Sequence, residues 1–296
     1  MNNKTVKEIK AKSMLHYHER TFATNWDANI YRGCEHNCKY CFAQYSHRYL
    51  ESKEFFKDIF VKINAAEILA YELGKRKWNK SAVNVCGISD CYQPQEAKYK
   101  IMPKVIKSFI INKNPLVITT KSILILRDME LLKELKEVAE VSIMISVSTL
   151  DEEKRKLIEP NSSPTIARMK MLKEFSEFGF KTAVLFMPII PYISDDKKNI
   201  DGIFQITKEY NLGPINAWPL HLRGNTKNVF YSFLYEKFPE LLPKYKILYQ
   251  NENVSKNYRL KLMEIISDRR EKYQLYSVYK PSKPKVGEWD QLSLFG

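Results

Sequence analysis

Short apolar runs alternate with longer amphipathic stretches through the middle of the chain. Runs in which nearly every residue is apolar are typical of strands in a parallel sheet that is covered on both faces. Apolar residues that return every three or four positions are typical of helices packed on such a sheet. The strands predicted in this way are 29–32, 82–86, 116–120, 141–147, 181–186 and 215–220, and 59–63 is a further short apolar segment.

The stretches between the predicted strands have the features of helices. Ile166, Met169, Leu172 and Phe175 recur at helical spacing, and Gly179 ends that element. Further helices are predicted at 65–73, 98–111, 129–139 and near 200–210. Strands that alternate with helices in this order indicate an α/β fold built on a parallel sheet.

The character of the chain changes after residue 224. Two helices rich in aromatic and basic residues are predicted at roughly 229–249 and 255–276, and we expect them to pack across the bottom or side of the α/β unit. Pro281 and Pro284 stiffen an exposed tail. The predicted division is an N-terminal arm (1–28), an α/β unit (29–224), a basic helical region (225–278) and a flexible tail (279–296).

The composition limits the class of protein. With 296 residues, of which 44% are hydrophobic, the chain can bury one large core. No apolar run approaches the roughly 20 residues that cross a bilayer, and no signal peptide opens the chain, so we expect a soluble, cytoplasmic protein without a membrane partner. The net charge of +14 favours a polyanionic partner, although lysine spread over the whole surface gives the same total.

Three of the five cysteines lie close together. Cys34, Cys38 and Cys41 have the spacing Cys-x3-Cys-x2-Cys, and three thiolates can hold an iron-sulfur cube whose fourth iron has no protein ligand. The alternatives are a zinc site with His36 as fourth ligand, a structural cluster, and a redox thiol pair. We do not expect a disulfide framework, because the cysteine count is odd and no signal peptide is present.

The cysteine loop and three other segments carry a family resemblance. The loop, with Tyr40 before its last cysteine, resembles the signature of the radical S-adenosylmethionine (radical SAM) superfamily, and its wider context resembles the spore photoproduct lyase-like branch. The agreeing segments are 31–43, 89–96, 150–153 followed by Glu159-Pro160, and 187–191. The resemblance implies an open, partial parallel β/α barrel of about six strands with a helical C-terminal extension.

The same resemblance implies two cofactors. A 4Fe-4S cluster would bind the amino and carboxylate groups of S-adenosylmethionine at its open iron. An electron from a donor such as flavodoxin or ferredoxin would then release a 5′-deoxyadenosyl radical, and the protein would orient the cofactor and exclude water.

Four residues are candidates for binding S-adenosylmethionine, because ligands gather at the carboxyl ends of parallel strands. Tyr40 matches an aromatic position of the family near the adenine, and packing of the loop is its alternative role. Lys121 can pair with the methionine carboxylate or be an ordinary exposed lysine, and Ser146 can bond the amine or ribose. Asp90 belongs to a polar rim that contacts cofactor or substrate, or caps the next helix.

Cys86 and Cys91 flank the turn after the strand at 82–86 and are the catalytic candidates. The spore photoproduct lyase-like branch has a hydrogen-donor cysteine in a similar place, before a Ser-Asp pair. By that resemblance Cys86 is the first candidate and Cys91 the second. The alternative for Cys86 is a small buried apolar residue. Glu159 and Arg168 are expected to form a structural ion pair.

The end of the chain resembles a docking peptide. The segment 291–295 is similar to the pentapeptide by which bacterial repair proteins bind the DNA sliding clamp. In this hypothesis Leu292, Leu294 and Phe295 fill an apolar groove and Gln291 fixes the register. The alternative is a tail that folds back on the barrel.

Together these features predict a radical SAM enzyme that abstracts hydrogen from nucleic acid, with DNA repair or modification as its role. The chain has neither a P-loop nor a GxGxxG segment, so nucleoside-triphosphate chemistry is not indicated. The competing hypotheses are radical modification of protein or RNA, and a non-catalytic iron-sulfur protein that binds DNA or the clamp.

Overall fold

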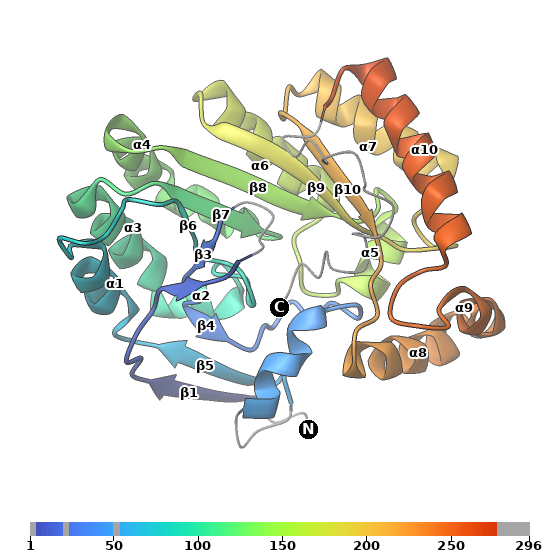
Figure 1. Cartoon of the computed structure of the whole chain (residues 1–296), viewed down its shortest axis with the longest axis horizontal. Helices are drawn as coiled ribbons and strands as arrows, with labels where there is room; N and C mark the ends of the chain where they lie inside the picture. Colours follow the sequence, from blue (N-terminus) through green and yellow to red (C-terminus); the bar gives the residue numbers. More distant parts are fainter. Residues whose placement is uncertain (1–3, 20–23, 50–53, 277–296) are drawn as a thin grey trace.

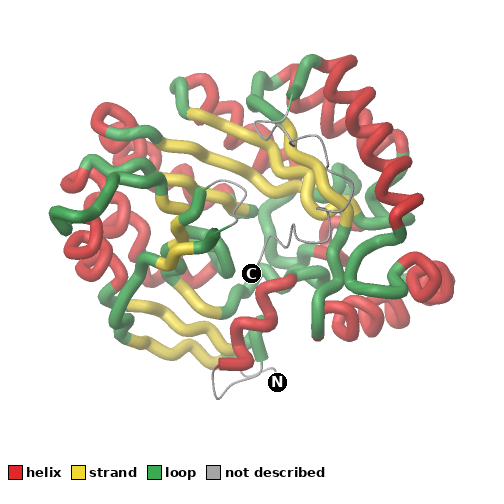
Figure 2. Tube along the Cα trace, in the orientation of Figure 1, coloured by secondary structure: helices red, strands yellow, loops and turns green. Residues whose placement is uncertain are grey.

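The main sheet of the computed structural model, which describes residues 4–19, 24–49 and 54–276, has seven strands in the order β10-β9-β8-β7-β6-β3-β2. Neighbouring strands are parallel except for β2 and β3. Their bounds are β2 His16–Tyr17, β3 Trp26–Asp27, β6 Val83–Asn84, β7 Leu116–Thr120, β8 Val141–Val147, β9 Lys181–Ile189 and β10 Ile215–Pro219. The strands form an open arc with helices on its outer side (Figures 1 and 2).

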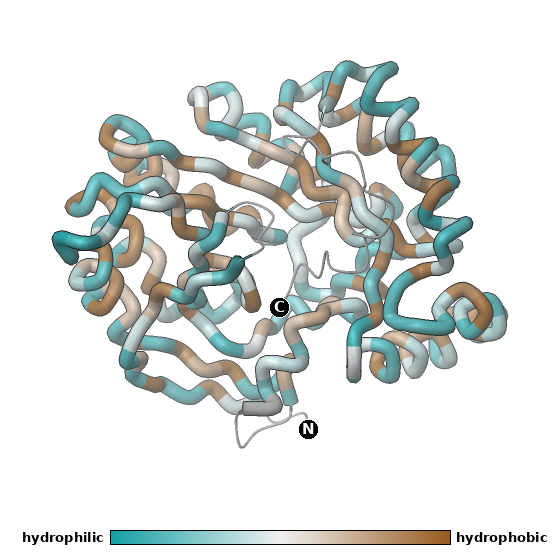
Figure 3. Tube along the Cα trace, in the orientation of Figure 1, coloured by the Kyte–Doolittle hydropathy of each residue, from teal (hydrophilic) through white to brown (hydrophobic). Residues whose placement is uncertain are grey.

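The helices on the outside of the arc cover apolar strands, as the alternating pattern predicts. Hydrophobic positions follow β8 to β10 and recur along the covering helices (Figure 3). The predicted strands 116–120 and 141–147 have the observed bounds. The parallel pairing of the strands from β3 to β10 confirms the predicted open parallel barrel. The helices of this part are α1 Ala65–Leu73, α2 Pro94–Tyr99, α3 Ile101–Asn112, α4 Met129–Val138, α5 Glu152–Ile158, α6 Thr165–Glu177 and α7 Lys197–Glu209, with short 3-10 segments η1 Phe42–Tyr49 and η2 Ile123–Asp128.

The N-terminal part differs from the predicted arm. β1 (Thr5–Ile9) pairs in parallel with β5 (Asp58–Lys62), and β5 pairs antiparallel with β4 (Tyr31–Arg32). These strands form a second, three-stranded sheet, so the strand predicted at 29–32 is not part of the main sheet. β1 is largely exposed and polar, and therefore lacks the apolar run by which the other strands are recognised.

The C-terminal helices also differ from the prediction. The expected helix at 229–249 is divided into α8 (Asn225–Lys237), a 3-10 turn (Pro239–Leu241) and α9 (Leu242–Leu248). The break follows from Pro239, which cannot continue a helix, and from Phe238, whose φ of −145° lies outside the helical region. α8 and α9 lie at the lower right of Figure 1, and their apolar residues pack with Cys38, Tyr40 and Leu220.

The last described helix, α10 (Lys256–Tyr273), lies along α7 and β10 (Figure 1). Arg270 donates to the backbone oxygen of Ile215 on β10 at 3.2 and 3.3 Å, and Arg269 pairs with Asp201 on α7. These contacts place α10 against the side of the barrel, as predicted for this helix.

Lys62 at the end of β5 generates a prediction for stability. Lys62 is only 6% exposed. Its burial, together with the nearby charge of Arg32, lowers its pKa to about 8. The unfolded chain therefore binds more protons than the folded chain between about pH 8 and 10.5, and stability rises with pH through that window.

We expect Lys62→Met to be more stable than the wild type below about pH 8, by up to roughly 3 kcal/mol, because no charge is then buried. The advantage should shrink as the pH approaches 10.5. Urea unfolding of both proteins at pH 7 and pH 10 measures it. An equal difference at the two pH values would contradict this account of Lys62.

Candidate active site

The cysteine loop begins at a glycine that no other residue can replace without movement. Gly33 has a φ of +77°, and a Cβ there would lie 2.4 Å from the backbone oxygen of Asp58. The backbone N–H of Cys34 donates to Phe55 at 3.2 Å, and that of Lys39 donates to Ile158 at 2.9 Å. The loop is therefore held from both sides, by the segment before β5 and by the end of α5.

The three cysteines of the loop are unpaired and close enough to influence one another. Cys34 and Cys38 are buried, and Cys41 is half-buried. Burial raises the pKa of each thiol to about 12, and the charge of a neighbouring loop cysteine adds to the shift. Thiols in such surroundings become thiolates when a metal ion supplies compensating charge.

The loop cysteines are not arranged around a single zinc ion. Sulfurs around one tetrahedral zinc lie about 3.8 Å apart, since each Zn–S bond is about 2.3 Å. Among the described residues, only Cys86, Asp90 and Cys91 bring three ligand atoms within 4.8 Å of one another, so the loop cysteines are spread more widely. Both ring nitrogens of His36 face oxygens of Asn161 and Asp90 at 3.0 Å, which leaves neither as the fourth zinc ligand.

Asp90 connects the loop to the end of β7. One carboxylate oxygen accepts from His36 Nε2 at 3.0 Å and from the Lys121 N–H at 2.7 Å, and the other accepts from the Tyr92 N–H at 2.9 Å. Thr120 Oγ1 lies 2.8 and 3.0 Å from the two oxygens. Although burial opposes ionisation, these partners lower the pKa of Asp90 to about 2. Because both oxygens are occupied, the geometry favours bracing over the cofactor contact predicted for Asp90.

Two amides also brace the loop, and sequence reasoning missed this role. The side chain of Gln93 accepts from the Glu35 N–H at 3.0 Å and donates to the Gly33 oxygen at 3.1 Å. Asn161 Nδ2 donates to the Glu35 oxygen at 2.7 Å. Their positions in the agreeing segment 89–96 and directly after Glu159-Pro160 were the only signal in the sequence.

A buried polar chain lies on the other side of the loop. The Tyr40 hydroxyl donates to Glu159, and Glu159 Oε2 lies 2.8 Å from Arg168 Nη2. Arg168 also donates to the backbone oxygen of Ser146. Burial opposes ionisation of Glu159, yet Arg168 and Lys121 lower its pKa to about 2. The predicted ion pair between Glu159 and Arg168 is confirmed, and the Tyr40 hydroxyl is committed to it.

Three of the predicted cofactor contacts gather at the ends of β7 and β8. Lys121 Nζ donates to Ser146 Oγ at 2.7 Å and lies 5.8 Å from the centre of the Tyr40 ring. Ser146 Oγ donates to the Met187 oxygen at 2.8 Å. The charge of Lys121 also reaches the thiols of Cys38 and Cys41. Lys121 is therefore half-buried beside the cysteine loop rather than an ordinary exposed lysine.

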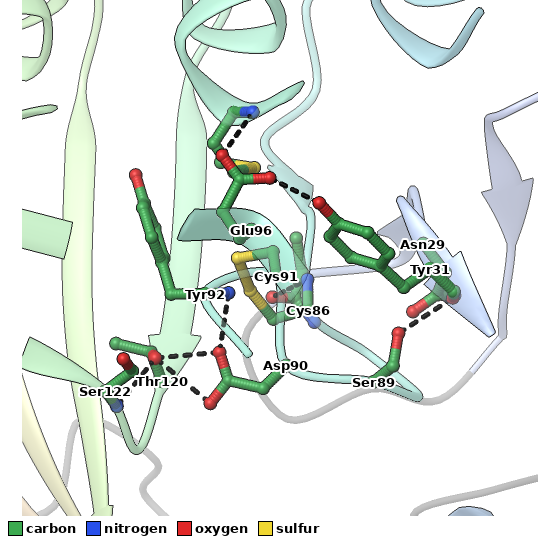
Figure 4. The surroundings of a disulfide bond; sticks show 12 residues. Asn29, Tyr31, Cys86, Ser89, Asp90, Cys91, Tyr92, Glu96, Thr120 and Ser122 are labelled. Carbon is green, nitrogen blue, oxygen red and sulfur yellow. Dashed lines mark hydrogen bonds between the residues drawn. A yellow bond between two sulfur atoms is a disulfide. The ribbon is translucent and has the colours of Figure 1, made fainter. Parts of the chain in front are cut away.

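Cys86 and Cys91 form a disulfide that was not predicted from the sequence (Figure 4). Neither residue carries a thiol hydrogen in this form, so the predicted hydrogen-donor role applies only to the reduced pair and stays a prediction. The odd number of cysteines was a poor reason to expect no disulfide, because three cysteines belong to the loop and the remaining two can pair.

Two further predictions concern the membrane and the end of the chain. No helix of the described residues is long and apolar enough to cross a membrane. The docking peptide with Gln291, Leu292, Leu294 and Phe295 lies outside the described residues, so clamp binding stays a prediction.

An open parallel barrel with a three-cysteine loop beside the strand ends defines a class of iron-sulfur enzymes with one iron left for a small molecule. The family model of the Radical SAM superfamily matches residues 28–201, and the chain belongs to this superfamily. It is therefore a radical SAM enzyme, whose cofactors are a 4Fe-4S cluster and S-adenosylmethionine.

The chain is also similar to curated proteins of other organisms and to a solved structure. The chain is 30% identical over 288 residues to an uncharacterized protein of Mycobacterium tuberculosis strain H37Rv, covering 95% of this chain and 85% of that protein. An uncharacterized protein of Methanocaldococcus jannaschii is 27% identical over 259 residues, 87% of this chain and 92% of that protein. The fold resembles that of spore photoproduct lyase complexed with a dinucleoside spore photoproduct, with a TM-score of 0.68, 14% identity, and coverage of 91% of this chain and 79% of that one.

The buried ion pair generates a prediction. We expect Arg168→Met to destabilise the protein by about 3–5 kcal/mol, because it leaves the Glu159 charge buried without its partner. The double variant Glu159→Gln, Arg168→Met buries no charge and should recover part of the loss. Urea unfolding of the three proteins measures both effects. A single variant within about 0.5 kcal/mol of the wild type would refute the role of the pair.

Proposed function

We propose that this radical SAM enzyme abstracts hydrogen from nucleic acid and serves in the repair or modification of DNA. When bound, the cluster and S-adenosylmethionine supply the 5′-deoxyadenosyl radical, with an electron from a flavodoxin- or ferredoxin-type donor. The residues of the chain bind and orient that cofactor and recognise the polymer.

The state of Lys121 carries the cofactor part of the proposal. Arg168 and His36 both face carboxylates, whereas Lys121 donates to the neutral hydroxyl of Ser146 and makes no ion pair with any described residue. An ammonium group whose only partner is neutral can still form a charge-assisted hydrogen bond with an incoming carboxylate. In the proposal Lys121 pairs with the methionine carboxylate, Ser146 bonds the amine or ribose, and the Tyr40 ring borders the adenine.

Three observations support nucleic acid as the substrate. The chain carries a net charge of +14, and strand ends are where ligands gather in parallel barrels. Tyr192 follows the end of β9, is 46% exposed, and has Lys244 Nζ 5.4 Å from its ring centre. An exposed ring beside a cation suits stacking of a base next to a phosphate. The likeness to spore photoproduct lyase, solved with a dinucleoside photoproduct, points the same way.

Transfer of deuterium tests this proposal. We expect the anaerobically reconstituted enzyme to form 5′-deoxyadenosine that carries deuterium when it is given perdeuterated DNA, either ultraviolet-irradiated or untreated. Perdeuterated RNA and peptide are the comparison substrates. Deuterium from RNA or peptide alone would favour the competing modification hypothesis. A stable cluster with no 5′-deoxyadenosine from any substrate would contradict catalysis.

Two variants serve as controls for that assay. Cys38→Ala removes a cluster ligand and should abolish 5′-deoxyadenosine. Lys121→Met should raise the concentration of S-adenosylmethionine needed for half-maximal rate about tenfold, the effect of losing a charge-assisted hydrogen bond worth roughly 1.5 kcal/mol. An unchanged requirement in Lys121→Met would remove Lys121 from the cofactor site.

The docking peptide at 291–295 adds a tether to the proposal. Binding to a ring on DNA would raise the local concentration of enzyme at its substrate. We expect deletion of residues 291–296 to abolish retention on an immobilised bacterial sliding clamp while the rate of 5′-deoxyadenosine formation stays the same. Equal retention of the full-length and shortened chains would eliminate the clamp hypothesis.

A further inference from the structure

The loop that bears Cys86 and Cys91 touches the cluster loop directly. The backbone N–H of Asp90, which precedes Cys91, donates to the sulfur of Cys34. The carboxylate of the same residue holds His36 and the backbone of Lys121. Figure 4 shows the disulfide on the turn that presents Asp90. Cys91 therefore directly follows the residue that contacts the cluster loop, and the disulfide links it to Cys86, four residues before Asp90.

The turn is also held by contacts other than the disulfide. The N–H of Ile88 donates to Asn29 Oδ1 at 2.7 Å, and Ser89 Oγ donates to the Tyr31 oxygen at 2.7 Å. Gly87 packs so closely that a Cβ there would lie 2.5 Å from Asp27 Oδ2. The sequence separation of five residues also means that the bond constrains the unfolded chain little. The turn can therefore keep its place when the bond is broken.

The cluster requires reducing surroundings, and the disulfide between Cys86 and Cys91 is exposed to the same surroundings. Cys34, Cys38 and Cys41 must be reduced to bind iron, and in reducing surroundings disulfides are mostly transient, catalytic or redox-sensing. Cys86 and Cys91 have Cα atoms 5.3 Å apart, within the range that allows a disulfide. We propose that Cys86 and Cys91 form a reversible dithiol–disulfide couple, a second redox centre beside the cluster loop.

The burial of the two sulfurs sets the direction of the exchange. Cys91 is fully buried, whereas Cys86 is half-buried. The thiolate of a dithiol reductant attacks Cys86 Sγ, the Cys86–Cys91 bond breaks, and Cys91 leaves as a thiolate that takes up a proton. The second thiol of the reductant then attacks the reductant sulfur that is bonded to Cys86 in the mixed disulfide. Cys86 is released as a thiolate and is protonated. Two electrons and two protons enter the pair, and the reductant leaves as a disulfide.

The reduced couple has a consequence that rests on the proposed function. Only this form carries a thiol hydrogen near the cluster loop, so the redox state of the couple determines whether the predicted hydrogen donor is present. The oxidised form retains the cluster ligands and the bracing by Asp90, because neither sulfur of the pair is one of the three loop cysteines.

Counting thiols in the holoenzyme tests the couple without any substrate. The protein, with its cluster bound, is equilibrated without oxygen in mixtures of reduced and oxidised dithiothreitol, quenched in acid, unfolded and alkylated, and each cysteine is assigned by peptide mass spectrometry. We expect alkylation of Cys86 and Cys91 to rise together with the dithiol fraction as a two-electron transition, and alkylation of the loop cysteines to stay complete.

Two results would overturn the proposal. Full alkylation of both residues in oxidised dithiothreitol alone would show that they do not pair, and a disulfide that persists in excess dithiothreitol would show a permanent bond. Neither result depends on turnover, so a failure of the nucleic-acid proposal is separate from a failure of this one.

Matched single variants test the direction of exchange. With glutathione disulfide, we expect the Cys91→Ser holoenzyme to form a mixed disulfide at Cys86 at least ten times faster than the Cys86→Ser holoenzyme forms one at Cys91. Equal rates would contradict the assignment of Cys86 as the attacked sulfur. Ultraviolet-visible absorption of the cluster in both variants verifies that the compared proteins are loaded equally.

Discussion

The carboxylate of Asp90 is the group through which the cluster loop, the turn after β6 and the end of β7 are joined. Its oxygens accept from His36, from Thr120 and from the backbone of Lys121. A carboxylate removed from water is stable only when its acceptor positions are filled, so each of these partners fixes the others. The chain thereby shapes the cysteine loop with its own hydrogen bonds, and Lys121 is oriented by the same group.

Among the described residues, Arg168 and His36 beside the loop face carboxylates, whereas Lys121 does not. Arg168 and Glu159 compensate each other in full burial, and His36 faces Asp90. The ammonium group of Lys121 donates to the hydroxyl of Ser146 and makes no ion pair with any described residue, although its charge also reaches Glu159. In the proposed function, Lys121 is the cation of this region that pairs with an anionic group of the cofactor.

The sequence predicted those features whose physical cause is local. The strand at 141–147 is a continuous apolar run because both of its faces are covered, and the spacing of the loop cysteines reflects a metal that several of them must reach. Features set by distant partners were missed. β1 (Thr5–Ile9) is polar and exists through its pairing with β5, and the brace formed by Gln93 depends on a backbone 58 residues away. Whether the number of cysteines is odd or even does not show whether Cys86 forms a disulfide.

Spectroscopy of the reduced cluster tests the central claim most directly, namely that three cysteines leave one iron for the cofactor. Electron–nuclear double resonance with S-adenosylmethionine labelled with ¹⁵N at its amino group and ¹⁷O at its carboxylate reports on atoms bound to that iron. The account predicts hyperfine coupling from both labels, and weaker ¹⁷O coupling in Lys121→Met. A reduced cluster whose spectrum is unchanged by the labelled cofactor would contradict it.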